Sequence, residues 1–596
     1  MHRSIIEKTL NTVTIFLIVL SCAKVSSPSG GPRDREPPVI IKSIPLSGTR
    51  NFRGREIVLS FNEYVVLDKI NEKFMVSPPM KSKPGIFIRG KSIRVTFQDE
   101  LRDSTTYTFY FQDAIRDLNE GNPIDNFQFV FSTGPVIDSL SLTGNLYTAF
   151  NLEVPDNTLV LLYSSMADSA VKKQLPDYIT RVEKNGEFRI DNIRDGRYRL
   201  YALKDIDNSK NFNLRDEEFA FLDEPVNINS EKNYLPVVKD TTGTTSAAGK
   251  TLVKPPVEGE FKLILFPAEK KLRYLTSSDR KMPYQLMYTL SLPPDSLKFN
   301  LSIPEAGDDS FFIERNRNRD TITVWLTDST LYSRTQIQTI VNYPFTDSLG
   351  LQVYIEDTIM MRFLAPRATR AKIKRTPYRV NTGITGSQYG IHKQIILKSP
   401  TPFIEPDTSR IRLYELAKEQ RLLVPVNLER DTTNSCRYIM NADLQEGKSY
   451  LFITDSAAFR NIYGEYSDST GVKFTVRTAD SYGKLILNIT NYEGARIIQL
   501  LSSAEKLIKE VHMKEDGTLE FPNLEKGFYR LRVIYDLNGD GKWTTGDFDT
   551  GRQPEPVSYY PGEIEIKVLW DVTQPWDIGT FNIKDYKLRS AQKSLR

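Results

Sequence analysis

Cysteine and histidine are scarce in this sequence. Its 596 residues include two cysteines, Cys22 and Cys436, and three histidines, His2, His392 and His512. A zinc site or a catalytic triad needs several such side chains close together, and neither a phosphate-binding glycine loop nor a nucleophile elbow is present. We therefore expect no enzyme activity and no small-molecule substrate. Paired carboxylates for glycoside hydrolysis stay open, since Asp and Glu are frequent.

An excess of charge of one sign is also missing. The chain has 79 Lys and Arg residues against 75 Asp and Glu residues, a formal net charge of +4. The two signs are interspersed along the sequence. A nucleic-acid-binding protein usually carries a basic face or stripe, so this composition gives no reason to expect a nucleic-acid partner.

No hydrophobic run is long enough to cross a bilayer as a helix, which takes about 20 residues. A short run, Val13–Leu20, follows Arg3 and Lys8 and leads into Ser21 and Cys22. This order of a basic start, a short apolar core and a small residue indicates a signal peptide over residues 1–21. An ordinary secretory signal beside a chance cysteine is the alternative.

The residues Val19-Leu20-Ser21-Cys22 resemble a bacterial lipobox. The resemblance implies cleavage before Cys22, a diacylglycerol on its thiol, and a membrane partner reached through the lipid anchor. Residues 22–36 are small, polar and rich in proline, so we interpret them as a tether. Cys436 is then an odd thiol, which we expect to be buried and inert.

From Pro37 onward apolar residues alternate with polar ones. Ile57, Leu59 and Phe61 form one such run, and residues 93–97, 107–111 and 127–131 form others. Period two predicts half-buried strands. We therefore predict an all-β protein made of tandem β-sandwich modules, Ig-like and prealbumin-like, that follow a lipoprotein signal peptide.

Residues 37–135 resemble the bacterial Ig-like domain of surface-layer proteins. The resemblance rests on short motifs in a fixed order: Pro37-Pro38, Phe61-Asn62-Glu63, Ser77-Pro78-Pro79, Thr106-Tyr107-Thr108-Phe109, residues 117–122 (DLNEGN) and Phe131-Ser132-Thr133-Gly134. Residues 101–107 (LRDSTTY) parallel residues 444–450 (LQEGKSY). We therefore expect a diverged Ig-like domain over residues 390–480.

A second repeat follows each Ig-like copy. Residues 185–216 align without a gap to residues 516–547, at an offset of 516 − 185 = 331. Both copies contain an Asn/Asp-Gly turn, a strand, a Gly turn and the sequence Tyr-Arg-Leu. The pattern resembles the prealbumin-like B-type repeat of bacterial surface proteins, which implies a spacer role. We place the repeats at 138–238 and 481–585, a linker at 239–256, and a β domain of unknown type at 257–365.

One loop of the second repeat has the spacing of a calcium site. Asp536, Asn538, Asp540 and Asp547 place side-chain oxygens at loop positions one, three, five and twelve, and Lys542 would offer its carbonyl at seven. Calcium prefers several hard oxygen ligands, so Ca²⁺ is the cofactor we expect. A metal-free polar turn is the alternative, because position twelve is a short Asp and a strand precedes the loop.

The first repeat carries a degraded copy of this loop, with Asp205, Asp207, Ser209 and Asp216 at the ligand positions. Lys210 replaces the glycine and brings positive charge into the loop. We expect a metal-free turn there.

Two further patterns leave alternatives open. Trp570 and Trp576 could stack on a sugar, although such residues more often belong to a core. Asp-Ser and Asp-Thr triplets resemble an O-glycosylation sequon of exported proteins, although they also form turns. These triplets begin at Asp103, Asp138, Asp168, Asp240, Asp295, Asp320, Asp328, Asp347, Asp357, Asp431, Asp455 and Asp468.

The chain as a whole resembles Ig-like-domain lipoproteins of the Bacteroidota, through Cys22, residues 28–38, the Ig-like domain and residues 553–557 (QPEPV). The resemblance implies a non-enzymatic scaffold or protein-binding lipoprotein at the outer membrane. Its partners would be other envelope proteins, including outer-membrane protein machinery, with a glycan-binding accessory protein as the alternative. Residues 23–27 lack acids, which favours the periplasmic face over the cell surface without deciding between them.

Overall fold

The computed structural model describes residues 34–229 and 261–579, with short gaps at 215, 270–271, 294–297, 305, 348–349, 364–377, 392, 418–419 and 492–493. Cys22, His392 and the predicted linker at 239–256 lie outside the described residues. Nearly all of the regular secondary structure in the described chain is β-strand, in many antiparallel sheets, which confirms the predicted all-β class with tandem β-sandwich modules. It separates into two compact units, residues 1–148 with 153–265 and residues 149–152 with 266–596.

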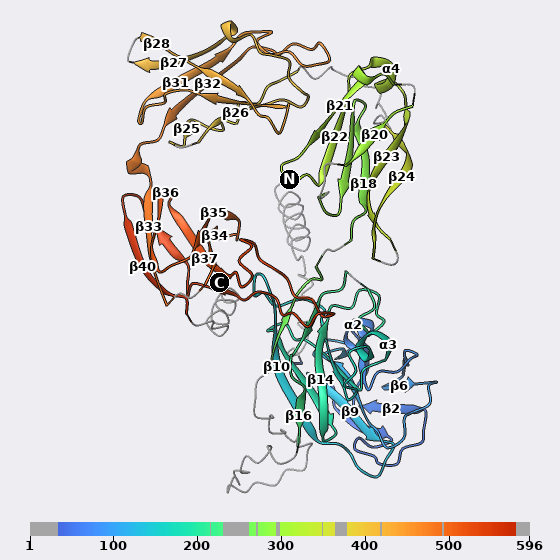
Figure 1. The fold of residues 1–596 in the computed structure, drawn as a ribbon. Helices are drawn as coiled ribbons and strands as arrows, with labels where there is room; N and C mark the ends of the chain where they lie inside the picture. The colour runs from blue at the N-terminus through green and yellow to red at the C-terminus, as the bar shows by residue number, and fades with distance from the viewer. Residues whose placement is uncertain are drawn as a thin grey trace, which may run out of the picture. The chain divides into compact units, whose positions relative to one another are not determined.

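The first unit begins with a sandwich that spans the predicted Ig-like segment (Figure 1, blue). Its sheets have the strand orders β1-β2-β6-β5, β4-β7-β9 and β3-β8. Its elements are β1 (Ile40–Ile44), β2 (Glu56–Phe61), β3 (Val65–Leu67), α2 (Ile70–Lys73), β4 (Met75–Ser77), β5 (Gly85–Arg89), β6 (Ser92–Thr96), β7 (Thr106–Gln112), β8 (Ile115–Asp117) and β9 (Phe127–Ser132). The alternating residues Ile57, Leu59 and Phe61 face the core and are almost completely buried.

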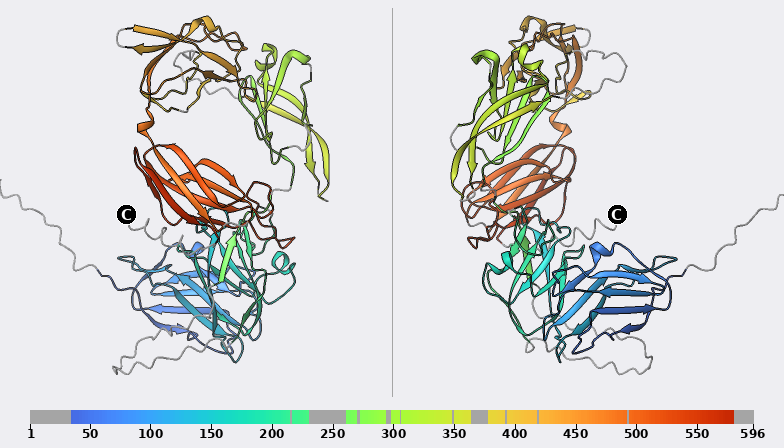
Figure 2. Two further views of the ribbon diagram at one scale, coloured as in Figure 1. Left: turned by 60° about the vertical axis from the view of Figure 1, so that its left-hand side comes forward. Right: turned by 90° about the vertical axis from the view of Figure 1, so that its right-hand side faces the viewer.

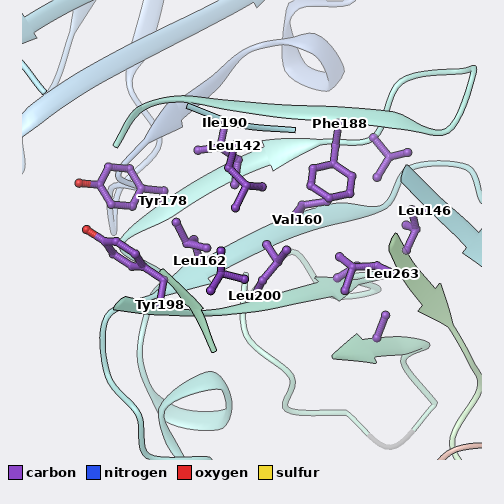
Figure 3. Packing of buried hydrophobic residues seen from close by; sticks show 14 of the residues in the cluster. Leu142, Leu146, Val160, Leu162, Tyr178, Phe188, Ile190, Tyr198, Leu200 and Leu263 are labelled. Atoms are coloured by element: carbon purple, nitrogen blue, oxygen red, sulfur yellow. The ribbon is translucent and has the colours of Figure 1, made fainter. Parts of the chain in front are cut away.

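The first repeat follows in the same unit. A three-stranded sheet, β13-β10-β17, and a five-stranded sheet, β12-β11-β14-β15 with β16 on β14, enclose an apolar core (Figure 3). The elements are β10 (Leu140–Thr148), β11 (Leu159–Tyr163), α3 (Ala170–Lys173), β12 (Tyr178–Arg181), β13 (Glu187–Ile193), β14 (Gly196–Leu203), β15 (Phe219–Phe221), β16 (Val226–Ile228) and β17 (Phe261–Leu265).

The end of this repeat differs from the sequence prediction. Residues 261–265 were expected to open the central domain, yet β17 pairs in parallel with β10, from Gly144 opposite Phe261 to Thr148 opposite Leu265. Leu263 and Leu265 are buried in the core of the repeat. The predicted linker therefore falls inside the first repeat, before its last strand, and does not separate two domains.

A polar seam joins the Ig-like domain to the first repeat. The buried Asn192 amide donates to the Thr108 hydroxyl at 2.8 Å, and the Ile179 N–H donates to Ser77 Oγ at 3.1 Å. Asn192 has a φ of 60°, a left-handed conformation that Asn tolerates better than most residues. The seam fixes these two modules against each other.

The second unit begins with the central domain (Figure 1, green). Its sheets are β18-β19-β22-β21 and β20-β23-β24. Its elements are β18 (Leu275–Met282), β19 (Gln285–Leu290), β20 (Asn300–Ser302), η2 (Asp308–Ser310), β21 (Phe311–Arg315), β22 (Thr321–Leu326), α4 (Ser329–Tyr332), β23 (Gln336–Thr346) and β24 (Gln352–Arg362).

A buried arginine ties this domain together. Arg280 is 6% exposed, and within the described residues its guanidinium donates hydrogen bonds to backbone carbonyls alone. The acceptors are Pro283 O at 2.7 Å, Arg334 O at 2.9 Å, Tyr332 O at 3.2 Å and Met361 O at 3.5 Å. Arg280 thus links the β18–β19 turn, the end of α4 and the end of β24. Burial lowers the pKa of Arg280.

The segment predicted to be a diverged Ig-like domain forms a β-sandwich with the sheets β25-β32-β31-β27-β28 and β26-β30-β29. Its elements are β25 (Gln388–Tyr389), β26 (Ile395–Lys398), η3 (Thr408–Arg410), β27 (Ile411–Ala417), β28 (Gln420–Val424), β29 (Asn427–Arg430), β30 (Arg437–Asn441), β31 (Ser449–Thr454), β32 (Thr470–Val476) and η4 (Ala479–Ser481).

One local motif of the first sandwich recurs in this second sandwich. The Tyr107 hydroxyl accepts the Arg102 N–H at 2.9 Å, and the Tyr450 hydroxyl accepts the Gln445 N–H at 2.7 Å. Tyr107 stacks on Phe131 as Tyr450 stacks on Phe474, with ring centroids 5.6 and 5.7 Å apart. The parallel between residues 101–107 and 444–450 therefore reflects shared three-dimensional structure.

The second repeat has the strand arrangement of the first (Figure 2, red). Its sheets are β36-β33-β40 and β35-β34-β37-β38, with β39 on β37. The elements are β33 (Gly483–Thr490), β34 (Arg496–Ser502), β35 (Leu507–Met513), β36 (Gly517–Leu524), β37 (Gly527–Tyr535), β38 (Val557–Tyr559), β39 (Ile564–Ile566) and β40 (Asp571–Asp577). The first and last strands, β33 and β40, pair in parallel as β10 and β17 do.

Candidate loop sites in the two repeats

The predicted calcium loop begins where β37 ends. Asp536 is buried, and its carboxylate accepts backbone N–H groups of the loop that follows: Gly539 at 2.8 Å and Asp540 at 3.2 Å on Oδ1, and Gly541 at 2.9 Å on Oδ2. Asn538 Oδ1 accepts the Asp540 N–H at 2.9 Å. Short polar side chains that bond their own backbone make compact turns, so the loop holds its shape through these bonds.

A residue that the sequence prediction missed closes the loop. Glu555 is 5% exposed. Its Oε1 accepts the Leu537 N–H at 2.8 Å and the Asn538 N–H at 3.3 Å, and its Oε2 accepts the Thr544 N–H at 2.9 Å. Glu555 therefore brings a second buried carboxylate to the loop that Asp536 begins.

The predicted twelfth ligand, Asp547, makes bonds to residues that follow it. The Asp547 backbone pairs with Arg552 in both directions, at 2.8 and 2.9 Å, and Asp547 Oδ1 accepts the Asp549 N–H at 3.1 Å. Asp540 Oδ1 accepts the Lys542 N–H at 2.8 Å. The acid whose bonds reach the start of the loop is Glu555, which lies eight residues beyond Asp547.

The first repeat has the same arrangement. Asp205 accepts the N–H groups of Ser209 at 3.1 Å and Lys210 at 3.0 Å. The fully buried Glu217 accepts the Ile206 N–H at 3.2 Å, and its other oxygen accepts the N–H groups of Asn213 and Leu214 at 3.2 and 3.1 Å. Four of these bonds have counterparts in the second repeat at the offset of 331, with the N–H groups of Leu537, Asp540, Gly541 and Thr544 as the donors there.

Three acids meet in the first loop. One oxygen from each of Asp205, Asp207 and Glu217 lies within 4.8 Å of the others, and this is the one group of three or more potential acid, His or Cys ligands among the described residues. The second loop has Asn538 where the first has Asp207. The first loop, expected to be the degraded copy, is therefore the one in which three acids converge; Asp216 does not belong to the group.

Burial shapes the charge of this group. It raises the pKa of Asp205, with the negative charge of Asp207 adding to the effect, and it raises the pKa of Glu217. Hydrogen bonds from Asn213 and Ser209 lower the pKa of the exposed Asp207 to about 2. Burial also lowers the pKa of Lys210. Two carboxylates whose charged forms are disfavoured by burial are groups that a cation would stabilise.

The two tryptophans do not form a shared platform. Trp576 is 4% exposed and packs edge-on against Tyr560 inside the core. Trp570 is exposed in the turn before β40, and Lys567 Nζ lies 4.8 Å from its ring centroid.

The remaining reactive side chains are isolated from one another. His512 is half-exposed and contacts Glu510 at 3.2 Å. Cys436 is a free thiol, and its pKa is raised to about 12 by burial and by the charge of Glu314. Over the described ranges, no helix is both long and apolar enough to span a membrane.

Comparison with known proteins identifies one module. Residues 34–133 match the model of the bacterial Ig-like domain family, so the first sandwich is a bacterial Ig-like domain, a non-catalytic type of domain. No curated protein matches the chain.

Solved structures give only weak likenesses. Alpha-2-macroglobulin of Escherichia coli is 12% identical, with a TM-score of 0.18 over 44% of this chain and 94% of that one. The surface-layer protein SbsC is 11% identical, with a TM-score of 0.13 over 82% and 63%, and a biofilm-associated protein is 8% identical, with a TM-score of 0.13 over 88% and 93%. This chain thus spans under two thirds of the SbsC chain. Such low TM-scores carry no functional conclusion.

Proposed function

We propose that this chain is a lipid-anchored, non-enzymatic scaffold or protein-binding protein of the cell envelope. The observation that carries the proposal is the short apolar run Val13–Leu20 followed by Ser21 and Cys22. Several acyl chains on one cysteine would hold the protein stably at a membrane. The β modules behind the tether then act as spacers and binding surfaces.

The anchor can be tested directly. Intact-mass analysis of the membrane-extracted protein should show a lipid on Cys22, and Cys22→Ala should move the protein into the soluble fraction. Cys436→Ala serves as the matched control and should stay with the membrane. A Cys22→Ala protein that remains membrane-bound would contradict the anchor.

The proposed location is the outer membrane, with other envelope proteins as partners. Outer-membrane assembly or export machinery is the first group to test, by co-purification from solubilised membranes with the anchor intact. Glycan binding is the competing function. It loses support because Trp576 is buried, and a glycan array with a Trp570→Ala control would separate the two.

We further propose that the repeat loops bind calcium. The supporting observation is the group Asp205, Asp207 and Glu217, with Asp536, Asn538 and Glu555 at the equivalent places. Affinity should be modest, with Kd about 10⁻⁴–10⁻³ M as in extracellular modules. Calcium at about 100 times Kd should then stabilise the protein by about 2.7 kcal/mol.

Calorimetric melting of the full chain tests the calcium proposal. Calcium should raise the Tm more than magnesium does, and Asp207→Asn should reduce the rise. Asp156→Asn, an exposed aspartate of the same repeat, should leave the rise unchanged. If calcium shifts no transition, the loops are polar turns held by the protein alone.

A further inference from the structure

The first strand after the tether is unusually apolar on its outside. Val39, Ile41, Ile44 and Leu46 are 58%, 67%, 55% and 70% exposed. They lie on or beside β1, the edge strand of the sheet β1-β2-β6-β5. The register places Ile44 opposite Val58, so Ile44 points away from the core that Ile57 and Leu59 fill. We call residues 39–46 the β1 strip.

The segment that carries the β1 strip has an excess of basic charge, although Glu56 lies on the same outer sheet face as Val58, where it pairs with Arg94 at 3.1 Å. Residues 37–55 contain no acid and four basic residues, Lys42, Arg50, Arg53 and Arg55, all of them exposed. Arg53 forms an exposed ion pair with Asp103 at 2.8 Å, which partly offsets its charge. Apolar side chains mixed with basic ones are typical of surfaces that bind anionic lipid, where the apolar groups enter the headgroup region and the cations contact phosphates.

Chain length places the β1 strip near the proposed anchor. Seventeen residues lie between Cys22 and Ile40, so the distance between these two residues is at most about 60 Å when the segment is fully extended. The first folded surface that the bilayer meets is therefore that of the Ig-like domain.

We propose that the β1 strip docks on the surface of a bilayer that contains anionic phospholipid. This inference rests on the proposed function for its setting, since the anchor brings the surface to the membrane. Lipid and strip then act as two linked attachments, and the strip orients the first domain instead of leaving it to turn freely on its tether.

Vesicle binding tests the strip without the anchor. The protein would begin at residue 22 and carry Cys22→Ala, so that no lipid is attached. It should sediment with phosphatidylglycerol–phosphatidylethanolamine vesicles, bind phosphatidylcholine vesicles more weakly, and lose affinity as salt rises. Ile41→Asp with Ile44→Asp should weaken binding about tenfold or more, because apolar contact is lost.

Two further variants complete the test. Leu422→Asp with Leu423→Asp alters an equally exposed apolar pair on β28 and should leave binding unchanged. Lys42→Glu with Arg50→Glu changes only exposed positions and should remove the preference for anionic vesicles.

The outcomes separate the two proposals. Failure of lipidation at Cys22 would leave these vesicle results intact. Absence of vesicle binding, or equal binding by the Ile41/Ile44 variant, would overturn membrane docking. If that variant keeps its vesicle binding but loses a protein that co-purifies with the wild type, the strip binds protein and the proposal is also overturned.

Discussion

Glu217 and Glu555 occupy the same position in the two repeats, each two residues before the strand, β15 or β38, that pairs beside the loop. Each carboxylate accepts the N–H that follows the first loop aspartate and another N–H seven residues later. The donors are Ile206 and Asn213 in one repeat and Leu537 and Thr544 in the other. This buried carboxylate clamp is preserved in both repeats.

Glu555→Gln should destabilise the second repeat. The amide group of the new glutamine would place its own N–H against one of the backbone N–H donors, so that a hydrogen bond is lost. A charge-assisted hydrogen bond to a buried group contributes about 1.5–3 kcal/mol. Denaturant unfolding followed by tyrosine and tryptophan fluorescence measures the loss. Glu565→Gln, at a half-exposed position of the same repeat, should change stability little; equal losses for the two variants would show that Glu555 is not a clamp.

Asn192→Ala should weaken the seam between the first Ig-like domain and its repeat. The substitution removes the hydrogen bond to Thr108. It also places alanine, whose side chain cannot hydrogen-bond to the local backbone, in a left-handed conformation, which costs about 1–2 kcal/mol. Asn523→Ala carries the same backbone cost, because Asn523 has a φ of 57°. We expect the larger Tm loss for Asn192→Ala, and equal losses would argue against the seam.

Arg280→Met should destabilise the central domain by about 3 kcal/mol or more, because several buried carbonyls lose their donor and each unsatisfied group costs about 1–3 kcal/mol. Arg280→Lys should recover only part of the loss, since an ammonium cannot reproduce the planar fork. Arg317→Met, at an exposed position of the same domain, is the control. If Arg280→Met left the unfolding transition of the central domain unchanged, Arg280 would not be the residue that links its three segments.

Cys436 should resist thiol reagents in the folded protein. With a thiol pKa near 12, almost no thiolate is present at pH 8, and the thiolate is the reactive form. In a Cys22→Ala background, iodoacetamide should label Cys436 slowly at pH 8, faster as pH rises toward 12, and rapidly after unfolding in guanidinium. Complete native labelling within minutes at pH 8 would contradict this picture.

Much of the fold followed from the sequence because period two is a direct consequence of strand geometry. Ile57, Leu59 and Phe61 alternate with polar residues and are buried as predicted. The offset of 331 identified two repeats that share one strand arrangement. The predicted start of the central domain at residue 257 differs from the structure, because parallel pairing of distant strands such as β10 and β17 leaves no local signal in the sequence. Judged by sequence, the strand at 261–265 could have begun a new domain equally well.

The loop sites were only half predictable. Asp536 and Asn538 belong to a continuous spacing motif, whereas Glu555 lies outside it. Its offset from Glu217 is 338, so seven extra residues follow Asp547 in the second repeat, and an ungapped alignment ends before the glutamate. The pair Glu217-Glu218-Phe219 and Glu555-Pro556-Val557, an acid two residues before a buried strand, was the available signal. The sequence left open whether Trp570 and Trp576 are packed or exposed, since aromatic residues in similar motifs look alike; core packing, the more frequent case, holds for Trp576 and not for Trp570.

The place of β17 has a consequence for synthesis. β10 is the middle strand of its sheet only once residues 261–265 have been made, so the first repeat keeps an open edge while the ribosome adds the preceding thirty or so residues. A protein cut at residue 238 would lack its closing strand and expose that edge permanently. If the chain were instead cleaved between β16 and β17, the two fragments should stay together, because the closing strand is held by backbone pairing and by Leu263 and Leu265 in the core.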